Sequence, residues 1–362
     1  MSAARESTAP PPLHTKWGVA VGMGIAAAAI LVVVILAFLW PSKTSGTHNL
    51  PVSIAGPAES VSALEAALGT SDTFEFVSAA DRDQAVDQIQ TRETYGAIVL
   101  GATAGTAPEV LTAPAASPVS AQLLSGVASQ LQAQLAKQVA AAGGDPSSVT
   151  VTVTPVVPLS ASDPTGAGLA AAAFPLAIGG MIGGILISLL VVGPLRRLAA
   201  VAGFAVVSGI ATSLVMQTWF EYLQGDFWLN ALAMGLTMLA TASFIIGCTS
   251  LLGRAGIAVG AITTMFIGNP LSAAATPWQF LPEPWGVVGQ YLVPGASNSL
   301  LRTLSYFPDA NAAQQWWTLT AWAALGVVLT LAGHFRSRAS MRVAPSSLEE
   351  GAPRRTSVEQ PA

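Results

Sequence analysis

Charged side chains are scarce in this chain of 362 residues. They make up 9% of it, whereas soluble globular domains carry roughly 25%, and 52% of the residues are hydrophobic. Fifteen basic and 19 acidic residues are too few to cover a body of this size with a surface suited to water. The composition therefore excludes an ordinary soluble protein and indicates that lipid covers part of the surface.

Basic charge is especially sparse. The formal net charge is -4, and lysine occurs only as Lys16, Lys43 and Lys137. A protein that binds nucleic acid needs a dense basic surface to neutralise phosphates, and this chain has none. We therefore expect no nucleic acid among its partners.

The residues that usually carry chemistry are also few. One cysteine, Cys248, excludes an intramolecular disulfide, and three scattered histidines (His14, His48, His334) exclude a structural zinc site. No lysine completes a phosphate-binding Gly-Lys-Ser/Thr motif, and neither Gly-x-Ser-x-Gly nor His-Glu-x-x-His occurs. We predict no catalytic residue, no cofactor and no enzymatic activity.

Long uncharged apolar runs are what the chain does contain. Residues 18–40 could cross a hydrocarbon core of about 30 Å as a helix, and the run ends in Phe38-Leu-Trp-Pro41 without the small residues of a signal-peptide cleavage site. We interpret it as an uncleaved anchor. Five further spans are predicted at residues 167–193, 198–218, 228–252, 255–271 and 316–335. The predicted fold is an α-helical polytopic membrane protein with six transmembrane helices.

The distribution of charge predicts the orientation. With the N-terminus cytoplasmic, the inner side holds ten basic and four acidic residues, a net charge of +6, and the outer side five and fifteen, a net charge of -10. Basic residues favour the cytoplasmic side of short loops. We expect a multi-pass plasma-membrane protein with a cytoplasmic N-terminal tail at residues 1–17 and a disordered cytoplasmic tail at 336–362.

Residues 41–166 are expected to form one extracytoplasmic α/β domain. Strands are predicted at 52–54, 73–77 and 95–100, with helices at 58–68 and after Asp81, whose spacing to Gln84 is typical of a helix cap. A long helix at 119–142 and a strand at 149–157 follow. The β-α-β-α-β order predicts a small sheet and could form a ligand crevice at strand ends, but no glycine-rich phosphate loop follows any strand.

Two motifs fall in the predicted five-helix membrane domain, residues 167–335. Gly179, Gly180, Gly183 and Gly184 form overlapping small-x-x-x-small pairs, which serve either packing within the bundle or a dimer seam. Residues 268–315 are too apolar for a plain loop and too broken for a span, so we expect an outer re-entrant or interfacial segment. Its marked residues are Asn269, Pro270, Pro282, Pro294, Gly295 and Arg302.

The predicted architecture combines one anchor, an outer α/β domain and five clustered spans. The outer segment adds Gly268-Asn-Pro270, Leu281-Pro282, Leu292-Val-Pro-Gly-Ala296 and Arg302. Together these features resemble the ABC-2-type membrane permease superfamily. Within it the chain is most similar to the phage-infection-protein-like branch of Gram-positive bacteria, through Pro51-Val-Ser-Ile54 and Tyr95-Gly-Ala-Ile-Val99. The alanine-rich, lysine-poor composition fits an actinobacterial source.

The resemblance implies a permease-like subunit that pairs with a second copy or a related chain, and with a separate ATPase for which Arg196 and Arg197 would be contacts. The chain departs from the superfamily in having Ala9-Pro-Pro-Pro12 in place of an amphipathic helix and only residues 194–198 as the inner loop. The function expected is export of an amphipathic or envelope-related substrate. The alternative is a membrane receptor or envelope scaffold that binds through its outer domain.

Overall fold

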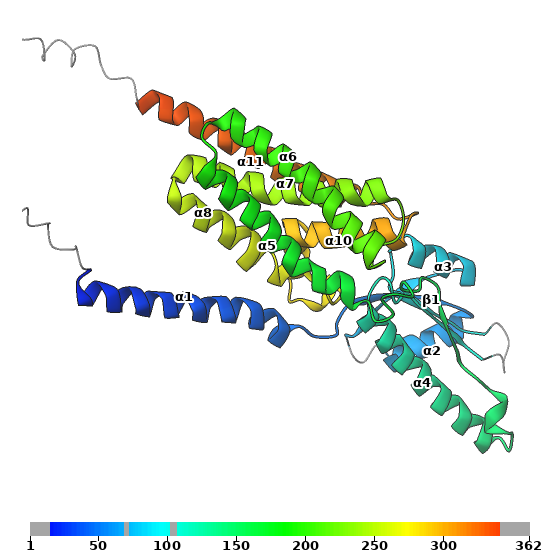
Figure 1. Ribbon diagram of the computed structural model, residues 1–362. Helices are drawn as coiled ribbons and strands as arrows, with labels where there is room; N and C mark the ends of the chain where they lie inside the picture. Colours follow the sequence, from blue (N-terminus) through cyan, green and yellow to red (C-terminus); the bar gives the residue numbers. More distant parts are fainter. Residues whose placement is uncertain (1–14, 69–71, 102–106, 341–362) are drawn as a thin grey trace, which may run out of the picture.

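The computed structural model describes residues 15–68, 72–101 and 107–340, and it consists of a helical bundle with a small α/β domain at one end (Figure 1). Most of the predicted N-terminal tail and residues 341–362 of the predicted C-terminal tail lie outside the described residues. Residues 336–340, assigned to that tail from the sequence, instead belong to the last helix. Residues 336–340 contain no proline or glycine that would end the helix.

Within the described residues, five helices are long and apolar enough to cross a membrane. They are α1 (Trp17–Thr44), α5 (Ala167–Leu190), α6 (Pro194–Ser213, continued by the π-helical turn η2, Leu214–Trp219), α7 (Phe227–Leu252) and α11 (Ala313–Ser340). Local signals start them: Pro194 occupies the first turn of α6, and the Asp226 carboxylate accepts a hydrogen bond from the Leu229 amide at 2.8 Å. Five of the predicted spans are thus helices of membrane-crossing length.

The predicted span at 255–271 is shorter than expected. It forms α8 (Arg254–Ala261) and the π-helical turn η3 (Ile262–Ile267), together 14 residues or about 21 Å, too short for a core of about 30 Å. Pro270 lacks an amide hydrogen and disfavours helix at the residue before it. Six continuous transmembrane helices are therefore not confirmed.

After this break the chain forms short pieces and then a second helix. They are η4 (Pro270–Ser272), η5 (Trp278–Phe280), α9 (Trp285–Gln290) and α10 (Val293–Tyr306). A Cβ on Gly268 would lie 2.9 Å from Pro294, so the end of η3 lies against the start of α10. From there α10 runs toward the α/β domain (Figure 1). Together, α8 with η3 and α10 make an interrupted passage through the bundle.

The α/β domain is built on a five-stranded sheet of order β2-β1-β3-β4-β5. Its strands are β1 (Leu50–Ala55), β2 (Phe74–Ser78), β3 (Gly96–Val99), β4 (Glu109–Thr112) and β5 (Thr152–Pro155), and its helices are α2 (Ala58–Leu68), α3 (Arg82–Gln90), α4 (Pro118–Ala141) and the 3₁₀ turn η1 (Pro146–Ser148). β1 pairs in parallel with β2 and β3, and β4 pairs antiparallel with β3 and parallel with β5. The expected strands are present, whereas β4 is an addition.

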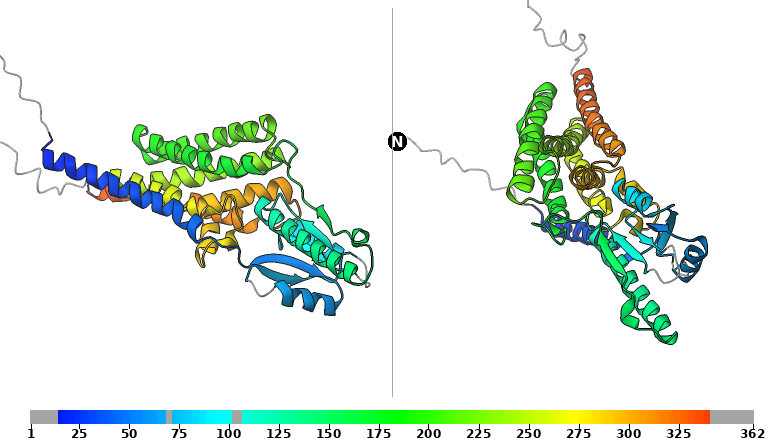
Figure 2. Two further views of the ribbon diagram at one scale, coloured as in Figure 1. Left: turned by 90° about the horizontal axis from the view of Figure 1, so that it is seen from below. Right: turned by 90° about the vertical axis from the view of Figure 1, so that its right-hand side faces the viewer.

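The sheet domain and the bundle share their apolar cores. Phe307, just after α10, lies in one cluster with Ile89 and Leu111, and Phe280 lies in a second with Val52 and Leu124. Residues 268–312 thus pack between the two parts of the molecule. Both described ends of the chain lie at the end of the bundle away from the sheet domain (Figures 1 and 2).

Candidate functional site

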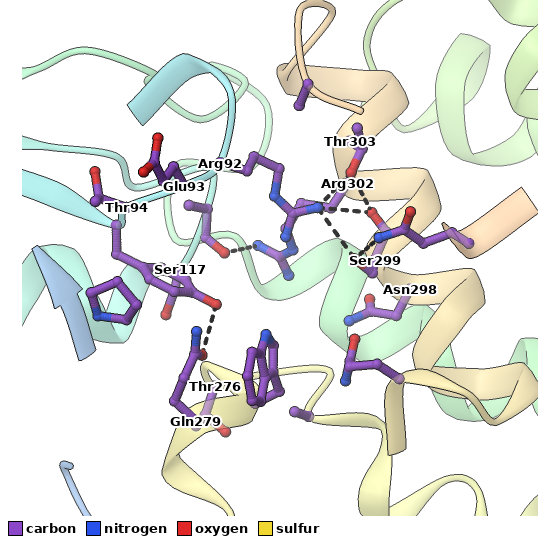
Figure 3. A pocket seen from close by; sticks show the side chains of 18 of the residues that line it. Arg92, Glu93, Thr94, Ser117, Thr276, Gln279, Asn298, Ser299, Arg302 and Thr303 are labelled. Atoms are coloured by element: carbon purple, nitrogen blue, oxygen red, sulfur yellow. Dashed lines mark hydrogen bonds between the residues drawn. The ribbon is translucent and has the colours of Figure 1, made fainter. Parts of the chain in front are cut away.

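A polar pocket of about 410 Å³ lies where the sheet domain meets α10. Most of its lining comes from three parts of the chain: the loop 91–95 before β3, the segment 272–279 after the bundle break, and residues 298–315 from α10 to the start of α11. The lining is completed by Pro51, Glu75, Ala116, Ser117 and Gln290. Ser299, Arg302 and Thr303 of α10 face Arg92 of the loop across it (Figure 3). The pocket lies at the amino ends of β1 and β3, where Pro51 and Tyr95 line it.

Arg92 reaches the pocket from the end of α3. Its backbone has a φ of 63°, in the left-handed region that commonly ends a helix, and the Glu93 amide donates back to the Gln88 carbonyl at 2.9 Å. Its Nη1 donates to the Ser299 carbonyl at 3.0 Å and to the Thr303 hydroxyl. The guanidinium also lies 5.4 Å from the centre of the Phe307 ring. One side chain thereby joins the sheet domain to α10.

Burial changes the ionisation of this wall of the pocket. Loss of hydration lowers the pKa of Arg92, and the nearby Tyr95 partly opposes that shift. Burial likewise raises the pKa of Tyr95, against the smaller effects of Arg92 and Arg302. An arginine keeps its proton at neutral pH even so. Arg92 therefore stays cationic and Tyr95 stays a neutral phenol, whose hydroxyl donates to Gln279 Oε1 at 3.1 Å.

Arg302 points into the same pocket from α10 and is only 6% exposed. Its Nη1 donates to the carbonyls of Ala115 and Ala116 at 2.9 and 3.1 Å, and its Nη2 donates to the Ala274 carbonyl at 3.3 Å. No carboxylate forms an ion pair with it: in the part of the chain that the structure describes, the only ion pair joins Arg82 and Glu109. Two guanidinium groups, that of Arg302 buried and that of Arg92 half-buried, thus share the pocket without a carboxylate in ion-pair contact with either. The buried carboxylate of Asp163 acts on Arg302 only from a longer distance.

Uncharged polar groups complete the wall. Gln315 donates to the Ser299 hydroxyl at 3.2 Å. Asn298 Oδ1 and Gln315 Oε1 are buried and have no hydrogen-bond partner among the described residues. Buried polar atoms normally have a partner. Neither oxygen has surface open to the pocket, so a bound molecule would reach them only after the two side chains turn. The exposed carboxylates of Glu75 and Glu93 lie at the rim.

The marked residues of segment 268–315 have different surroundings. Arg302 alone of them lines the pocket. Asn269 and Pro270 lie at the break after η3, where the Asn269 carbonyl accepts from the Ser272 amide at 3.1 Å. Pro294 and Gly295 begin α10, and a Cβ at Gly295 would collide with the Gly289 carbonyl. The Pro282 carbonyl accepts from Trp285 at 2.8 Å and starts the turn into α9.

The glycine motif of α5 mostly packs inside the bundle. Gly180 and Gly184 leave no free room for a Cβ against Thr241 and Ala242 of α7, and Gly183 lies against Phe204 of α6. Gly179 has no neighbouring atom within 4 Å of such a Cβ. Three of the four glycines thus have intrachain packing, and only Gly179 presents an open face to a second chain.

The two arginines at the start of α6 differ. Arg197 donates to the Val191 and Ser188 carbonyls at 2.8 and 2.9 Å and to the Ser250 hydroxyl at 3.2 Å, so it ties the end of α5 to α7. Arg196 is exposed. Of the pair, Arg196 is therefore the side chain free to meet another protein.

Arg92 was not singled out from the sequence. The available signal was that few basic residues fall on the predicted outer side, and that Arg92 follows a helix in an acidic domain. Its partner segment begins 207 residues later, so spacing along the chain could not reveal the pair. Among the described residues, no group of three histidine, cysteine, aspartate or glutamate side chains could hold a metal ion.

Fold and site together define a class: a helical protein with five candidate membrane-spanning helices in the part of the chain that the structure describes, and a small α/β domain that meets the bundle at a cationic pocket. Comparisons with protein-family models, curated proteins and solved structures found no match to this chain.

Proposed function

We propose that the protein is a permease-like subunit of the plasma membrane that exports or flips an amphipathic or envelope-related substrate. The observation that carries this proposal is the interrupted passage of α8, η3 and α10 through the bundle. Irregular backbone at membrane depth is tolerated where it is covered by protein or lines a water-filled cavity, and transporters bind substrates at such discontinuous helices. Counted as one crossing, the interrupted passage makes six.

Polar side chains beside the break support a substrate path. Thr237 of α7 donates to the Ser297 hydroxyl of α10 at 2.8 Å, and both line a small hollow of about 20 Å³ with Thr241 and Asn298. That hollow holds no more than a water molecule, so transport would require α10 to move relative to α7. Asn298 lines both this hollow and the cationic pocket.

Energy would come from a separate ATPase that meets the end of the bundle away from the sheet domain, with the protein acting as a homodimer or heterodimer. The exposed Arg196 is the proposed contact. Arg196→Glu should abolish co-purification of the ATPase, whereas Arg254→Glu, an exposed arginine at the same end, serves as the matched control. Failure to capture an ATPase, together with substrate flux that survives ATP depletion, would contradict this coupling.

The predicted orientation can be tested by labelling in cells. In a Cys248→Ser background, a cysteine replacing the exposed Gln130 of α4 should react with an impermeant thiol reagent. A cysteine replacing Arg196 should react only after the membrane is permeabilised. The reverse pattern would place the sheet domain in the cytoplasm.

The alternative, a receptor or envelope scaffold, is favoured by the pocket itself, because the sheet domain contributes the loop of Arg92 to it. The two functions differ in flux. Purified protein in liposomes with its ATPase should move a fluorescent lipid between leaflets if it is a permease. Ligand binding without any such flux would favour the receptor.

A further inference from the structure

We propose that the pocket between the sheet domain and α10 binds an oxyanion, the phosphate ester of a hydroxyl-bearing headgroup. The proposal deepens the proposed function by giving the substrate a chemical class, and it rests on that function only for the step from binding to transport. Four observations carry it: charge, free donors, unpartnered acceptors and room.

Charge is the first observation. Arg92 and Arg302 both line the pocket, and each is held by carbonyl and hydroxyl oxygens rather than by a carboxylate. Removing a cation from water is costly unless an opposite charge accompanies it, and two like charges add to that cost. A bound anion between the two guanidinium groups would offset both costs.

Free donors are the second observation. Arg92 makes all of its described hydrogen bonds through Nη1. Its Nε and Nη2 have no partner among the described residues, and neither is sealed inside the protein. These two N–H groups form the parallel fork with which arginine binds two oxygens of one phosphate or carboxylate. The pocket thus presents an unused bidentate donor.

The third observation distinguishes a phosphate ester with hydroxyl groups from a bare anion. The buried Oδ1 of Asn298 and Oε1 of Gln315 are acceptors without partners among the described residues. An unprotonated anion offers them no hydrogen, whereas the hydroxyl groups of a polyol or sugar headgroup do, once the two amide groups turn from their sealed positions toward the pocket. Cations on one side and acceptors on α10 and α11 therefore match a headgroup that carries both.

Room is the fourth observation. A volume of about 410 Å³ is within the range of small-molecule sites, roughly 300 to 1,000 Å³, and accepts a phosphoglycerol-sized group. Asn298 belongs both to this pocket and to the hollow beside the bundle break. A headgroup held here would therefore lie next to the interrupted passage.

The test measures binding to the full-length purified protein. Inorganic phosphate and glycerol phosphate are titrated by calorimetry in a phosphate-free detergent buffer. Separately, protein is titrated with mixed micelles containing phosphatidylglycerol or, as the neutral counterpart, phosphatidylcholine. We expect saturable binding of glycerol phosphate and of phosphatidylglycerol, weaker binding of inorganic phosphate and none specific to phosphatidylcholine. Binding of glycerol phosphate but not of phosphatidylglycerol would assign the site to a free ligand.

Variants show whether the pocket is responsible. Arg92→Gln removes the fork and should weaken binding at least about tenfold, since a charge-assisted hydrogen bond contributes more than a neutral one. Asn298→Asp keeps the size of the side chain and both arginines but adds a negative charge, so it should also abolish anion binding. Arg82→Gln, on an exposed arginine of the same domain, is the matched control and should bind like the unchanged protein.

Asn298→Asp keeps the test decisive if Arg92→Gln does not fold. Equal binding in Asn298→Asp and Arg82→Gln, or no binding of any phosphate ester by the unchanged protein, would overturn the proposal. Anion binding without lipid flux would refute the permease function and leave the anion site standing. Lipid flux that is unaffected in Asn298→Asp would refute the anion site and leave the permease function standing.

Discussion

Helices α1 and α7 have nearly the same length, 28 and 26 residues, but opposite surroundings. In the apolar 18-residue stretch of each helix that would cross the membrane, protein buries no residue of α1 but 83% of the residues of α7. At its sheet-domain end α1 has two aromatic contacts, Phe38 with Phe174 and Trp40 with Trp285, at ring-centre distances of 6.3 and 6.2 Å. In contrast, α7 packs against α5, α6, α8, α10 and α11.

The comparison shows that apolar character and burial are separate properties in this molecule. The more apolar helix, α1, is the less packed, and the central helix α7 carries small and polar residues such as Gly247, Thr237 and Ser243. Lipid is as apolar as a leucine side chain, so helices in a membrane associate through close packing and hydrogen bonds rather than through hydrophobicity. Glycine and alanine also occur throughout α1, so the feature that distinguishes the central helix is its buried polar residues, Asn230, Thr237, Thr241 and Ser243.

The largest effect is expected where α11 meets α7. A Cβ on Gly326 would overlap the backbone of Ser243 and Phe244, which cannot move aside as a side chain could. Gly326→Val should therefore destabilise the bundle by about 3 kcal/mol or more, since overpacking against backbone has few ways to relax. The measurement is the free energy of unfolding in a titration with sodium dodecyl sulfate.

Gly24→Val in α1 is the matched control, because no atom lies within 4 Å of its Cβ. It should leave stability and yield unchanged. Equal damage from the two substitutions would break the comparison, and would show that a second chain or another element packs on α1.

A smaller effect is expected from truncating a side chain. Phe244 of α7 is 8% exposed and its ring lies edge-on to Trp322 at 4.8 Å. Phe244→Ala should cost about 2 kcal/mol, less than the 3 to 5 of soluble cores, because the unfolded helix stays in lipid and only packing is lost. Ile30→Ala in α1, where Ile30 is 65% exposed, should cost almost nothing in the same titration.

The smallest effect is expected outside both helices, at the ion pair of the sheet domain. Arg82 Nε lies 2.7 Å from Glu109 Oε2, and the hydrogen bond from Arg82 lowers the pKa of that carboxyl below its unfolded value of about 4.3. The pair therefore stabilises the fold above that value, and its contribution is lost as pH falls through the lower folded pKa. We expect less than about 1 kcal/mol, because both side chains are partly exposed.

Thermal unfolding of the protein between pH 3 and 7, compared with Glu109→Gln, measures this contribution. The difference between the two should be present at pH 7 and shrink toward pH 3. A difference that does not change with pH would mean that the carboxylate acts through packing alone.

Prediction from the sequence succeeded where the signal is local. The helix of residues 58–68 agrees with α2, and Asp81 caps α3 by accepting a hydrogen bond from the Gln84 amide at 2.9 Å. Strand β4 was missed because Glu109–Thr112 is short and next to a proline, and its strand geometry depends on antiparallel pairing with β3. The break before Pro270 was visible, but its place beside α10 was not.

The sequence by itself determined which segments are apolar enough to enter lipid, because transfer to lipid is a sum over neighbouring residues. It also identified Arg302 within an unusual segment, but not the partner of that segment. Only the tertiary structure decided that α7 is central and that the end of η3 at Gly268 lies against α10. It alone also showed that Arg92 meets Ser299 from 207 residues away. Packing and hydrogen bonding between distant segments depend on their arrangement in space, which no local pattern of residues records.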